Sequence, residues 1–381
     1  MQRGFRVTTR STFRRAAIAG GGMVGRVHRQ ALSVLGIPLV GVLGSDPVRG
    51  EVLAHEWGAD QAFTDIETLA ASDVEVVHLC TPTGTHADYA RVLIDAGKHV
   101  ICEKPLATTA AAAEELTAAA ARRGVVAAVP FVYRYYSAVR EIRARVQHGD
   151  LGPITLLHGS YLQDWLLDPL ASNWRVDAAA GGASRAFADI GSHWCDLIEW
   201  ITGERFVKLV AQLSTSVPER PTPTGPSFSA PSAVGGPLMK VDTEDIATLL
   251  LRTDRGVPAN LTVSQVSSGR KNRLWFEIDG ASGSASFNHE NPEQAWFGDA
   301  HGEMALFARG SGTAHATDRL PSGHPQGWDS AFTSFISDAY AAVDGESPEG
   351  LPTFADGAHA AHLVDAVLSS AQDEQWKEIA G

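Results

Sequence analysis

Short apolar runs alternate with amphipathic stretches along the first third of the chain. The apolar runs predict strands at 15–19, 39–43, 74–80, 99–102 and 125–130. Helical stretches lie between them, for example at 24–35 and 107–123. Strands and helices that alternate in this way are joined by right-handed crossovers, so they build a parallel sheet with helices on both faces. We therefore predict a doubly wound α/β domain at residues 14–135.

After residue 150 the pattern changes to successive strands joined by turns. These strands are expected at 155–161, 208–213, 246–252, 259–265, 274–279 and 285–288. Proline, serine and glycine punctuate residues 214–236, which predicts a long loop that is either functional or merely solvated. Helices at 330–343 and 355–375 close the chain. The pattern predicts an α+β domain at 136–381 with a large open-faced mixed or antiparallel sheet, whose last helices can pack back on the first domain.

Three glycines directly follow the first predicted strand. Gly20, Gly22 and Gly25 form the pattern G-x-G-x-x-G between a strand and a helix. Gly20 allows a tight turn, Gly22 lets the backbone approach a pyrophosphate, and Gly25 permits close packing of the helix on the sheet. Amides at the start of the helix, at Met23 and Val24, then serve the phosphates. We predict a dinucleotide site, and the alternative is a glycine-rich turn without a ligand.

The end of the second predicted strand bears on the choice between NAD and NADP. A carboxylate there binds the ribose hydroxyls of NAD, whereas a small residue with serine and arginine accepts the 2′-phosphate of NADP. Gly44, Ser45, Asp46 and Arg49 offer both kinds of group. Asp46 also precedes Pro47, so it can equally cap the next helix. The residues favour NAD and leave NADP open.

Candidate acid–base residues come from two distant parts of the sequence. Lys104 follows the strand at 99–102, at the carboxyl end where open α/β sheets bind ligands, and Pro105 restricts the backbone beside it. Asp189 and His193 are four residues apart, so on a helix they share a face. A histidine beside a carboxylate suits proton transfer at neutral pH. Each feature alone also fits surface charges, a surface pair or a helix cap.

Composition and charge exclude several other classes. The 31 basic and 44 acidic residues give a formal charge of −13, which repels polyanions and argues against a nucleic-acid partner. Cys80, Cys102 and Cys195 have the spacing of neither a zinc site nor a disulfide framework, so we expect no metal and a cytoplasmic location. Arg14 and Arg15 before an apolar stretch suggest a twin-arginine signal, but glycines and basic residues follow at once. We interpret that stretch as the first strand, residues 1–13 as a flexible extension, and no segment as a membrane span.

The motifs occur together in one order along the chain. They are Gly20, Gly22, Gly25 and His28; Cys80-Thr81-Pro82-Thr83-Gly84-Thr85-His86; Glu103-Lys104-Pro105; Tyr133-Arg134-Tyr135; and Asp189-Ile190-Gly191-Ser192-His193. This set resembles the family of glucose-fructose oxidoreductase, inositol 2-dehydrogenase and the rhizopine-catabolism proteins (Gfo/Idh/MocA). The resemblance implies a Rossmann domain followed by an open-faced sheet domain, assembled as a homodimer or homotetramer. It also implies cofactor contacts from Thr81, Pro82, Thr83, His86, Glu103 and Lys104.

Residues 161–175 look similar to the levoglucosan dehydrogenase branch of that family. Aromatic rings stack on the C–H faces of a sugar, while amide, carboxylate and guanidinium groups bind its hydroxyls. Trp165 and Trp174 fit core positions as well. The chain departs from the family at Val132, where asparagine is usual, and at residues 184–187, where small apolar residues are common. The expected substrate contacts are Arg134, Tyr161, Gln163, Asp164, Trp165, Trp174, Arg175 and His193.

The resemblance implies an NAD(P)-dependent dehydrogenase that oxidises a ring hydroxyl of a sugar, glycoside or polyol, with C3 as the position that the branch suggests. In this hypothesis His193 removes the hydroxyl proton, Asp189 orients the imidazole, and Lys104 stabilises the developing alkoxide. One alternative is an enzyme that uses transient oxidation to cleave or eliminate a glycoside. Another is a non-catalytic dinucleotide sensor, which would have no need of these three groups.

Overall fold

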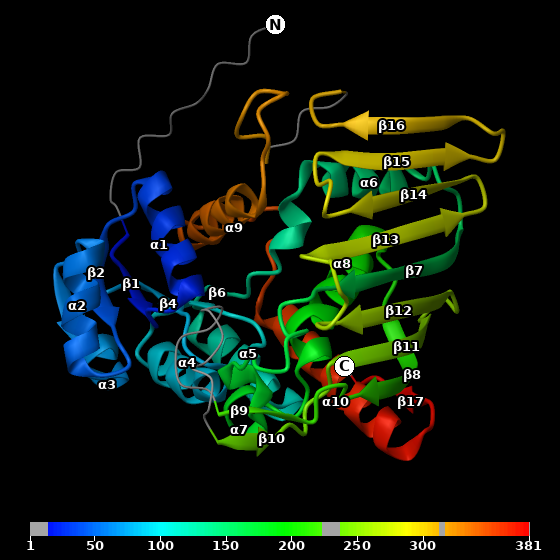
Figure 1. The fold of residues 1–381 in the computed structure, drawn as a ribbon. Coiled ribbons are helices and arrows are strands. Elements are labelled where there is room, and N and C mark those ends of the chain that lie inside the picture. Colours follow the sequence, from blue (N-terminus) through cyan, green and yellow to red (C-terminus); the bar gives the residue numbers. More distant parts are fainter. Residues whose placement is uncertain (1–13, 223–236, 312–316, 381) are drawn as a thin grey trace, which may run out of the picture.

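The computed structural model describes residues 14–222, 237–311 and 317–380, and its two domains lie side by side (Figure 1). The first domain has a six-stranded parallel sheet in the order β3-β2-β1-β4-β5-β6. Its strands are β1 (Ala16–Ala19), β2 (Leu39–Leu43), β3 (Gln61–Phe63), β4 (Val76–Leu79), β5 (His99–Cys102) and β6 (Ala127–Ala128). Its helices are α1 (Met23–Leu35), α2 (Pro47–Trp57), α3 (Ile66–Ala70), η1 (Thr83–Thr85), α4 (His86–Asp95) and α5 (Ala110–Arg123).

Burial explains the strands of this sheet. Every residue of β1, β2 and β4 is buried, as expected for parallel strands covered on both faces. The apolar stretch that follows Arg14 and Arg15 therefore forms a central strand, since β1 lies between β2 and β4. The predicted doubly wound domain is confirmed.

The second domain is built on a nine-stranded sheet in the order β16-β15-β14-β13-β7-β12-β11-β8-β17. Only β7 and β12 pair in parallel, so the sheet is mixed, as predicted. Side chains of β11 alternate between buried and exposed positions, because helices cover one face and the other is open. The strands are β7 (Ile154–Leu162), β8 (Phe206–Ser214), β11 (Ile246–Thr253), β12 (Pro258–Ser264), β13 (Arg273–Gly280), β14 (Gly283–Asn288), β15 (Gln294–Asp299), β16 (Met304–Ala308) and β17 (Lys377–Glu378).

Helices of the second domain connect the two sheets. Helix α9 packs against α1, and α10 packs against α5 and β8 (Figure 1). Within the described residues, no helix has the length and apolar character needed to cross a membrane. The remaining helices are η2 (Val132–Tyr135), α6 (Ser137–His148), η3 (Trp174–Val176), α7 (Ala178–Gly181), η4 (Phe187–Gly191), α8 (Ser192–Thr202), α9 (Trp328–Val343) and α10 (Phe354–Asp373).

The prediction that residues 214–236 contain no strand is wrong. Strand β9 (Glu219–Pro221) pairs with β10 (Leu238–Lys240). Arg220 of β9 is fully buried and donates to the carbonyl oxygens of Leu166, Asp168 and Ala171, which holds β9 against that segment. Residues 223–236 of the predicted loop, and the predicted extension at 1–13, lie outside the described residues.

Candidate active site

The glycine turn between β1 and α1 has the geometry of a dinucleotide cradle. Gly20 has φ of +105°, and a Cβ there would lie 2.4 Å from the carbonyl oxygen of Cys80. A Cβ on Gly25 would lie 2.1 Å from the Gly20 oxygen, so this glycine lets α1 approach the turn. At Gly22 a Cβ would meet nothing within 4 Å, and no side chain among the described residues caps α1. The space beside Gly22 and the uncapped start of α1 therefore fit a pyrophosphate.

At the end of β2, Asp46 is the N-cap of α2. Its carboxylate accepts from the Arg49 amide at 2.9 Å and from the Ser45 hydroxyl at 3.1 Å. The helix-cap interpretation is therefore confirmed. Gly44 is required by packing, because a Cβ there would lie 2.4 Å from the amide nitrogen of Gly50. Since Asp46 is exposed and keeps free lone pairs, the same carboxylate can also accept from a ribose hydroxyl.

In the loop after β4, the His86 side chain bonds to backbone carbonyl oxygens of the protein. His86 is buried, with Nδ1 2.8 Å from the Pro105 oxygen and Nε2 2.8 Å from the Thr81 oxygen. Its ring thus joins the loops after β4 and β5, and a direct contact between His86 and the cofactor is not supported. Thr83 is buried as well, while Thr81 is half-buried and Pro82 exposed.

A pocket of about 250 Å³ lies where the glycine turn, the end of β5 and the second domain meet. It brings together the lysine, the aspartate and the histidine that the sequence singled out. Its lining residues are Met23, Val24, Glu103, Lys104, Pro130, Val132, Tyr133, Tyr161, Gln163, Arg175, Asp189, Ile190, His193, Asn272, Trp328 and Phe332.

Lys104 and Asp189 form the central ion pair of this pocket. The Lys104 Nζ lies 2.6 Å from Asp189 Oδ1 and 2.9 Å from the Asp189 carbonyl oxygen. The other carboxylate oxygen accepts from Gln265 Nε2 at 2.9 Å, and Arg175 Nε is 3.5 Å from Oδ1. Burial opposes ionisation of Asp189, but the charges of Lys104 and Arg175 outweigh it and lower its pKa. The aspartate is therefore a carboxylate that anchors the lysine.

His193 is held by aromatic rings rather than by Asp189. The centroid of its ring lies 5.0 Å from that of Tyr133 and 5.5 Å from that of Phe131, both edge to face. Its Nδ1 is buried without a hydrogen-bond partner among the described residues. Asp189 was expected to orient the imidazole, but no hydrogen bond joins these two side chains in the described residues, where Lys104 and Gln265 engage the carboxylate. Burial and the nearby Lys104 charge lower the pKa of His193 well below its ordinary value, which keeps the ring neutral.

The helix that carries these two residues begins in a π-helical turn, η4, that runs directly into α8. Its first amides are capped by buried acceptors. Glu244 Oε1 accepts from the amides of Arg185 and Phe187 at 3.0 and 2.8 Å, and the Ser184 hydroxyl accepts from Ala188 at 3.2 Å. The Arg185 guanidinium is fully buried against Asp245. Residues 184–187, which depart from the family pattern, therefore fix the helix start.

Asn272, at the entrance to β13, is a pocket residue that the sequence analysis missed. Its Oδ1 accepts from the Tyr161 hydroxyl at 2.7 Å and from Gln163 Nε2 at 2.8 Å, and its Nδ2 donates to the Tyr133 hydroxyl at 3.2 Å. Gln265 was also missed, as a partner of Asp189. Both residues were missed because contacts between distant strands leave no local pattern in the sequence.

Four predicted substrate residues do not line this pocket. Arg134 is buried, and its guanidinium is paired with the carboxylates of Asp196 and Asp356 rather than pointing to a substrate. Asp164 pairs with Lys271 at 2.8 Å. The two tryptophans support neighbours that do line the pocket: the Trp165 indole donates to Gln163 at 3.0 Å, and the Arg175 guanidinium stacks 4.4 Å from the Trp174 ring centroid.

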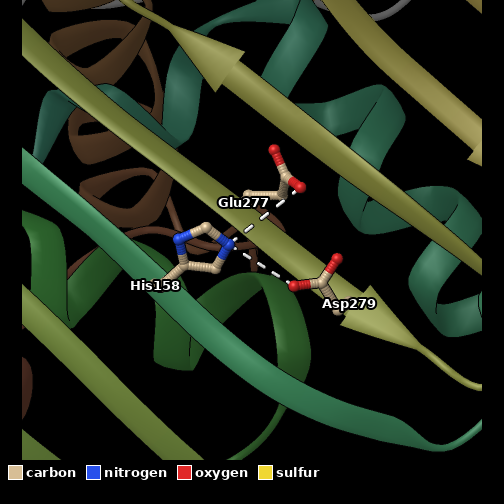
Figure 2. A group of neighbouring side chains, drawn as sticks. All are labelled: His158, Glu277 and Asp279. Carbon is tan, nitrogen blue, oxygen red and sulfur yellow. Dashed lines mark ion pairs between the residues drawn. The ribbon is translucent and has the colours of Figure 1, made fainter.

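A second group of ionisable side chains lies on the open face of the sheet, away from the pocket. His158 on β7 faces Glu277 and Asp279 on β13 (Figure 2). Its Nε2 is 3.4 Å from Asp279 Oδ2 and 4.0 Å from Glu277 Oε1. All three side chains are half-buried and pair with one another across the two strands. The group takes no part in the pocket.

Known proteins match both domains. Residues 14–131 match the model of the oxidoreductase family with an NAD-binding Rossmann fold, and residues 139–286 match the GFO/IDH/MocA C-terminal domain. The chain belongs to the Gfo/Idh/MocA family of oxidoreductases. The family resemblance and the assignment as an oxidoreductase are therefore confirmed.

Several relatives of this oxidoreductase are similar over nearly its whole length. Levoglucosan dehydrogenase from Pseudarthrobacter phenanthrenivorans is 30% identical and covers 95% of this chain and 97% of its own. A levoglucosan dehydrogenase solved with NADH and L-sorbose has a TM-score of 0.89 at 28% identity, covering 97% of this chain and 99% of that one. An inositol dehydrogenase homologue from Azotobacter vinelandii with NAD⁺ has a TM-score of 0.84 at 27% identity, covering 97% and 98%.

Proposed function

We propose that this oxidoreductase is an NAD(P)-dependent sugar or polyol dehydrogenase that exchanges a hydride between a hydroxyl-bearing ring carbon and nicotinamide. The observation that carries the proposal is the convergence of Lys104, Asp189 and His193 in one pocket beside the glycine turn. Relatives named for levoglucosan and inositol, and relatives solved with NADH or NAD⁺, support the substrate class and favour NAD over NADP. Ring C3 is the position of oxidation that we favour.

The first domain supplies the groups that would hold the cofactor. The amides at Gly22, Met23 and Val24 would bind the pyrophosphate, and Asp46 would accept from the adenosine ribose. Glu103 lines the inner part of the pocket and would accept from a further hydroxyl. When bound, the nicotinamide ring supplies the hydride acceptor, and in the reverse direction the hydride donor.

The proton is handled by this chain's own side chains. A neutral His193 imidazole accepts the proton of the sugar hydroxyl, and the Lys104 ammonium donates a hydrogen bond to the oxygen as its negative charge grows. Asp189 holds that ammonium in place through the 2.6 Å contact. Tyr161, Gln163, Arg175 and Asn272 would bind the other hydroxyls of the sugar, and Trp165 and Trp174 would support them from behind.

The test is a panel of sugars, glycosides and polyols with NAD⁺ or NADP⁺, followed at the absorbance band of the reduced nicotinamide. We expect at least one sugar to reduce NAD⁺, and His193→Ala and Lys104→Ala each to lower the rate by roughly 10²–10⁴. Rates within about twofold of wild type in both variants would overturn the proposal. A glycoside-cleaving enzyme would instead release the leaving group without net reduction of the cofactor.

We also propose that the protein forms a homodimer or homotetramer through the open face of the sheet and works in the cytoplasm. That face carries the exposed apolar side chains of Leu250, Met304 and Leu306. The free thiols, including buried Cys102 and Cys195, suit a reducing compartment. Light scattering tests the assembly, and Leu306→Asp should convert it to monomers.

A further inference from the structure

A line of buried hydrogen bonds runs from helix α9 to the residue before Lys104. The Tyr340 hydroxyl lies 3.0 Å from His78 Nε2, and His78 Nδ1 lies 2.7 Å from His28 Nδ1. His28 Nε2 then lies 3.3 Å from Glu103 Oε1. These four residues come from α9, β4, α1 and the end of β5, and none of them is more than 8% exposed. The proposed mechanism leaves the tyrosine and both histidines without a role.

The donors and acceptors along this line follow from its end at the Glu103 carboxylate. The Lys104 amide donates to Glu103 Oε2 at 3.2 Å, and a carboxylate only accepts, so His28 donates from Nε2. With both rings neutral, each imidazole has one donor and one acceptor, so His28 Nδ1 accepts from the Nδ1–H of His78. His78 Nε2 in turn accepts from the Tyr340 hydroxyl. Burial, together with the neighbouring His28, lowers the pKa of His78 well below its ordinary value, which agrees with a neutral ring.

We propose that Tyr340, His78 and His28 are positioning residues that orient the Glu103 carboxylate toward the cofactor. Glu103 lines the pocket together with Met23 and Val24 of the glycine turn. Each of its oxygens receives one donor from the protein and keeps a lone pair for a hydroxyl of a bound dinucleotide. The inference rests on the proposed function, because it requires a dinucleotide in this pocket.

Removing only the Tyr340 hydroxyl tests the positioning of Glu103 separately from the packing of the rings. The Tyr340 ring stacks on His78 with centroids 5.9 Å apart, and Tyr340→Phe keeps that ring while removing the donor at the end of the line. His78 is then free to take the other tautomer, and the orientation of Glu103 is no longer fixed. We expect the Kd for NADH, measured by fluorescence, to rise three- to tenfold, while the KM for the sugar stays within twofold of wild type.

Two substitutions of His28 should raise the Kd for NADH by different amounts. One substitution on α9 controls for a loss of stability. His28→Gln keeps a side-chain N–H within reach of Glu103, whereas His28→Leu keeps none, so the Kd for NADH should rise more in the leucine variant. Phe335→Leu alters another fully buried ring of α9 that is outside the line. It should lower the melting temperature and leave the Kd for NADH within twofold.

Nitrogen-15 NMR of histidine-labelled, cofactor-free protein tests the proton assignment itself. The expected result is His28 protonated at Nε2 and His78 protonated at Nδ1. The opposite tautomers would overturn the inference, and so would a Kd for NADH within twofold of wild type in Tyr340→Phe, or an equal rise in Phe335→Leu. Wild-type protein that binds no NADH would overturn the proposed function together with this inference, whereas equal binding by wild type and variants would overturn only the inference.

Discussion

The buried ion pair between Lys104 and Asp189 can be tested energetically with a double-mutant cycle. Lys104→Met removes the ammonium and keeps an apolar stem, and Asp189→Asn removes the negative charge and keeps the shape. If the pair anchors the lysine, each single substitution removes the same interaction, so the double variant should be more stable than the sum of the two effects predicts.

The geometry sets the magnitude of this coupling. Two unit charges 2.6 Å apart attract by about 6 kcal/mol at an effective dielectric constant of about 20. The cost of desolvating both groups opposes that attraction. The side chains keep 15% and 12% exposure, and Asp189 retains Gln265 and Arg175 as partners after the lysine is lost. We therefore expect each single substitution to cost about 2–4 kcal/mol and the coupling energy to be about 2 kcal/mol.

The assay is equilibrium urea unfolding of wild type, both single variants and the double variant at one pH and ionic strength. Arg91 and Glu115 provide a control cycle, because their 3.2 Å pair is at the surface and one partner is 73% exposed. That control should couple by less than about 1 kcal/mol. A coupling energy for Lys104 and Asp189 that is no larger than the control value would refute the view that the carboxylate anchors the lysine.

The pH dependence, the glycine turn and Asn272 can each be tested separately. Because burial and the Lys104 charge lower the pKa of His193 below its ordinary 6.5, the imidazole stays a competent base at pH 6.5, so kcat/KM for oxidation should fall only at more acidic pH. Lys104→Met removes one lowering influence and should move that acid limb to higher pH; an unmoved limb would count against the assignment. Gly22→Val should raise the Kd for NADH at least tenfold and change the free energy of unfolding by less than about 0.5 kcal/mol. Gly25→Ala should instead lower the free energy of unfolding by about 1–3 kcal/mol, because its Cβ clashes with the turn. Asn272→Ala should raise the KM for the sugar about tenfold, the loss of about one to two hydrogen bonds, with NADH binding unchanged as the check.

Local signals were sufficient for most strands of the two large sheets, for the glycine turn, and for Lys104, Asp189 and His193 as residues that share one pocket. Continuous apolar runs predicted β2 and β5 with their exact bounds, because buried parallel strands need apolar residues on both faces. Strand β9 was missed because a buried arginine, which bonds to carbonyls about fifty residues earlier, holds it in place and leaves no local pattern. Strands β15 and β16 went unpredicted too.

Spacing along the sequence did not predict the partners of the pocket residues. An i,i+4 pattern suggested that Asp189 serves His193, but the carboxylate is satisfied by a lysine 85 residues earlier and a glutamine 76 residues later. Arg134 was expected in the pocket because of its motif, yet Asp196 and Asp356 engage it within the protein. In both cases a charge that is buried on folding must find a partner, and the partner comes from another element.

In the proposed mechanism, hydride leaves a hydroxyl-bearing carbon of a sugar in the pocket that Lys104 and His193 line. A sugar that reduces NAD⁺, labelled with deuterium at the oxidised carbon, tests it directly when the reduced cofactor is isolated and examined by mass spectrometry and NMR. We expect one deuterium at C4 of the nicotinamide, at a rate that falls roughly 10²–10⁴-fold in His193→Ala. Deuterium recovered in water with no labelled NADH, or an undiminished rate in the variant, would contradict it.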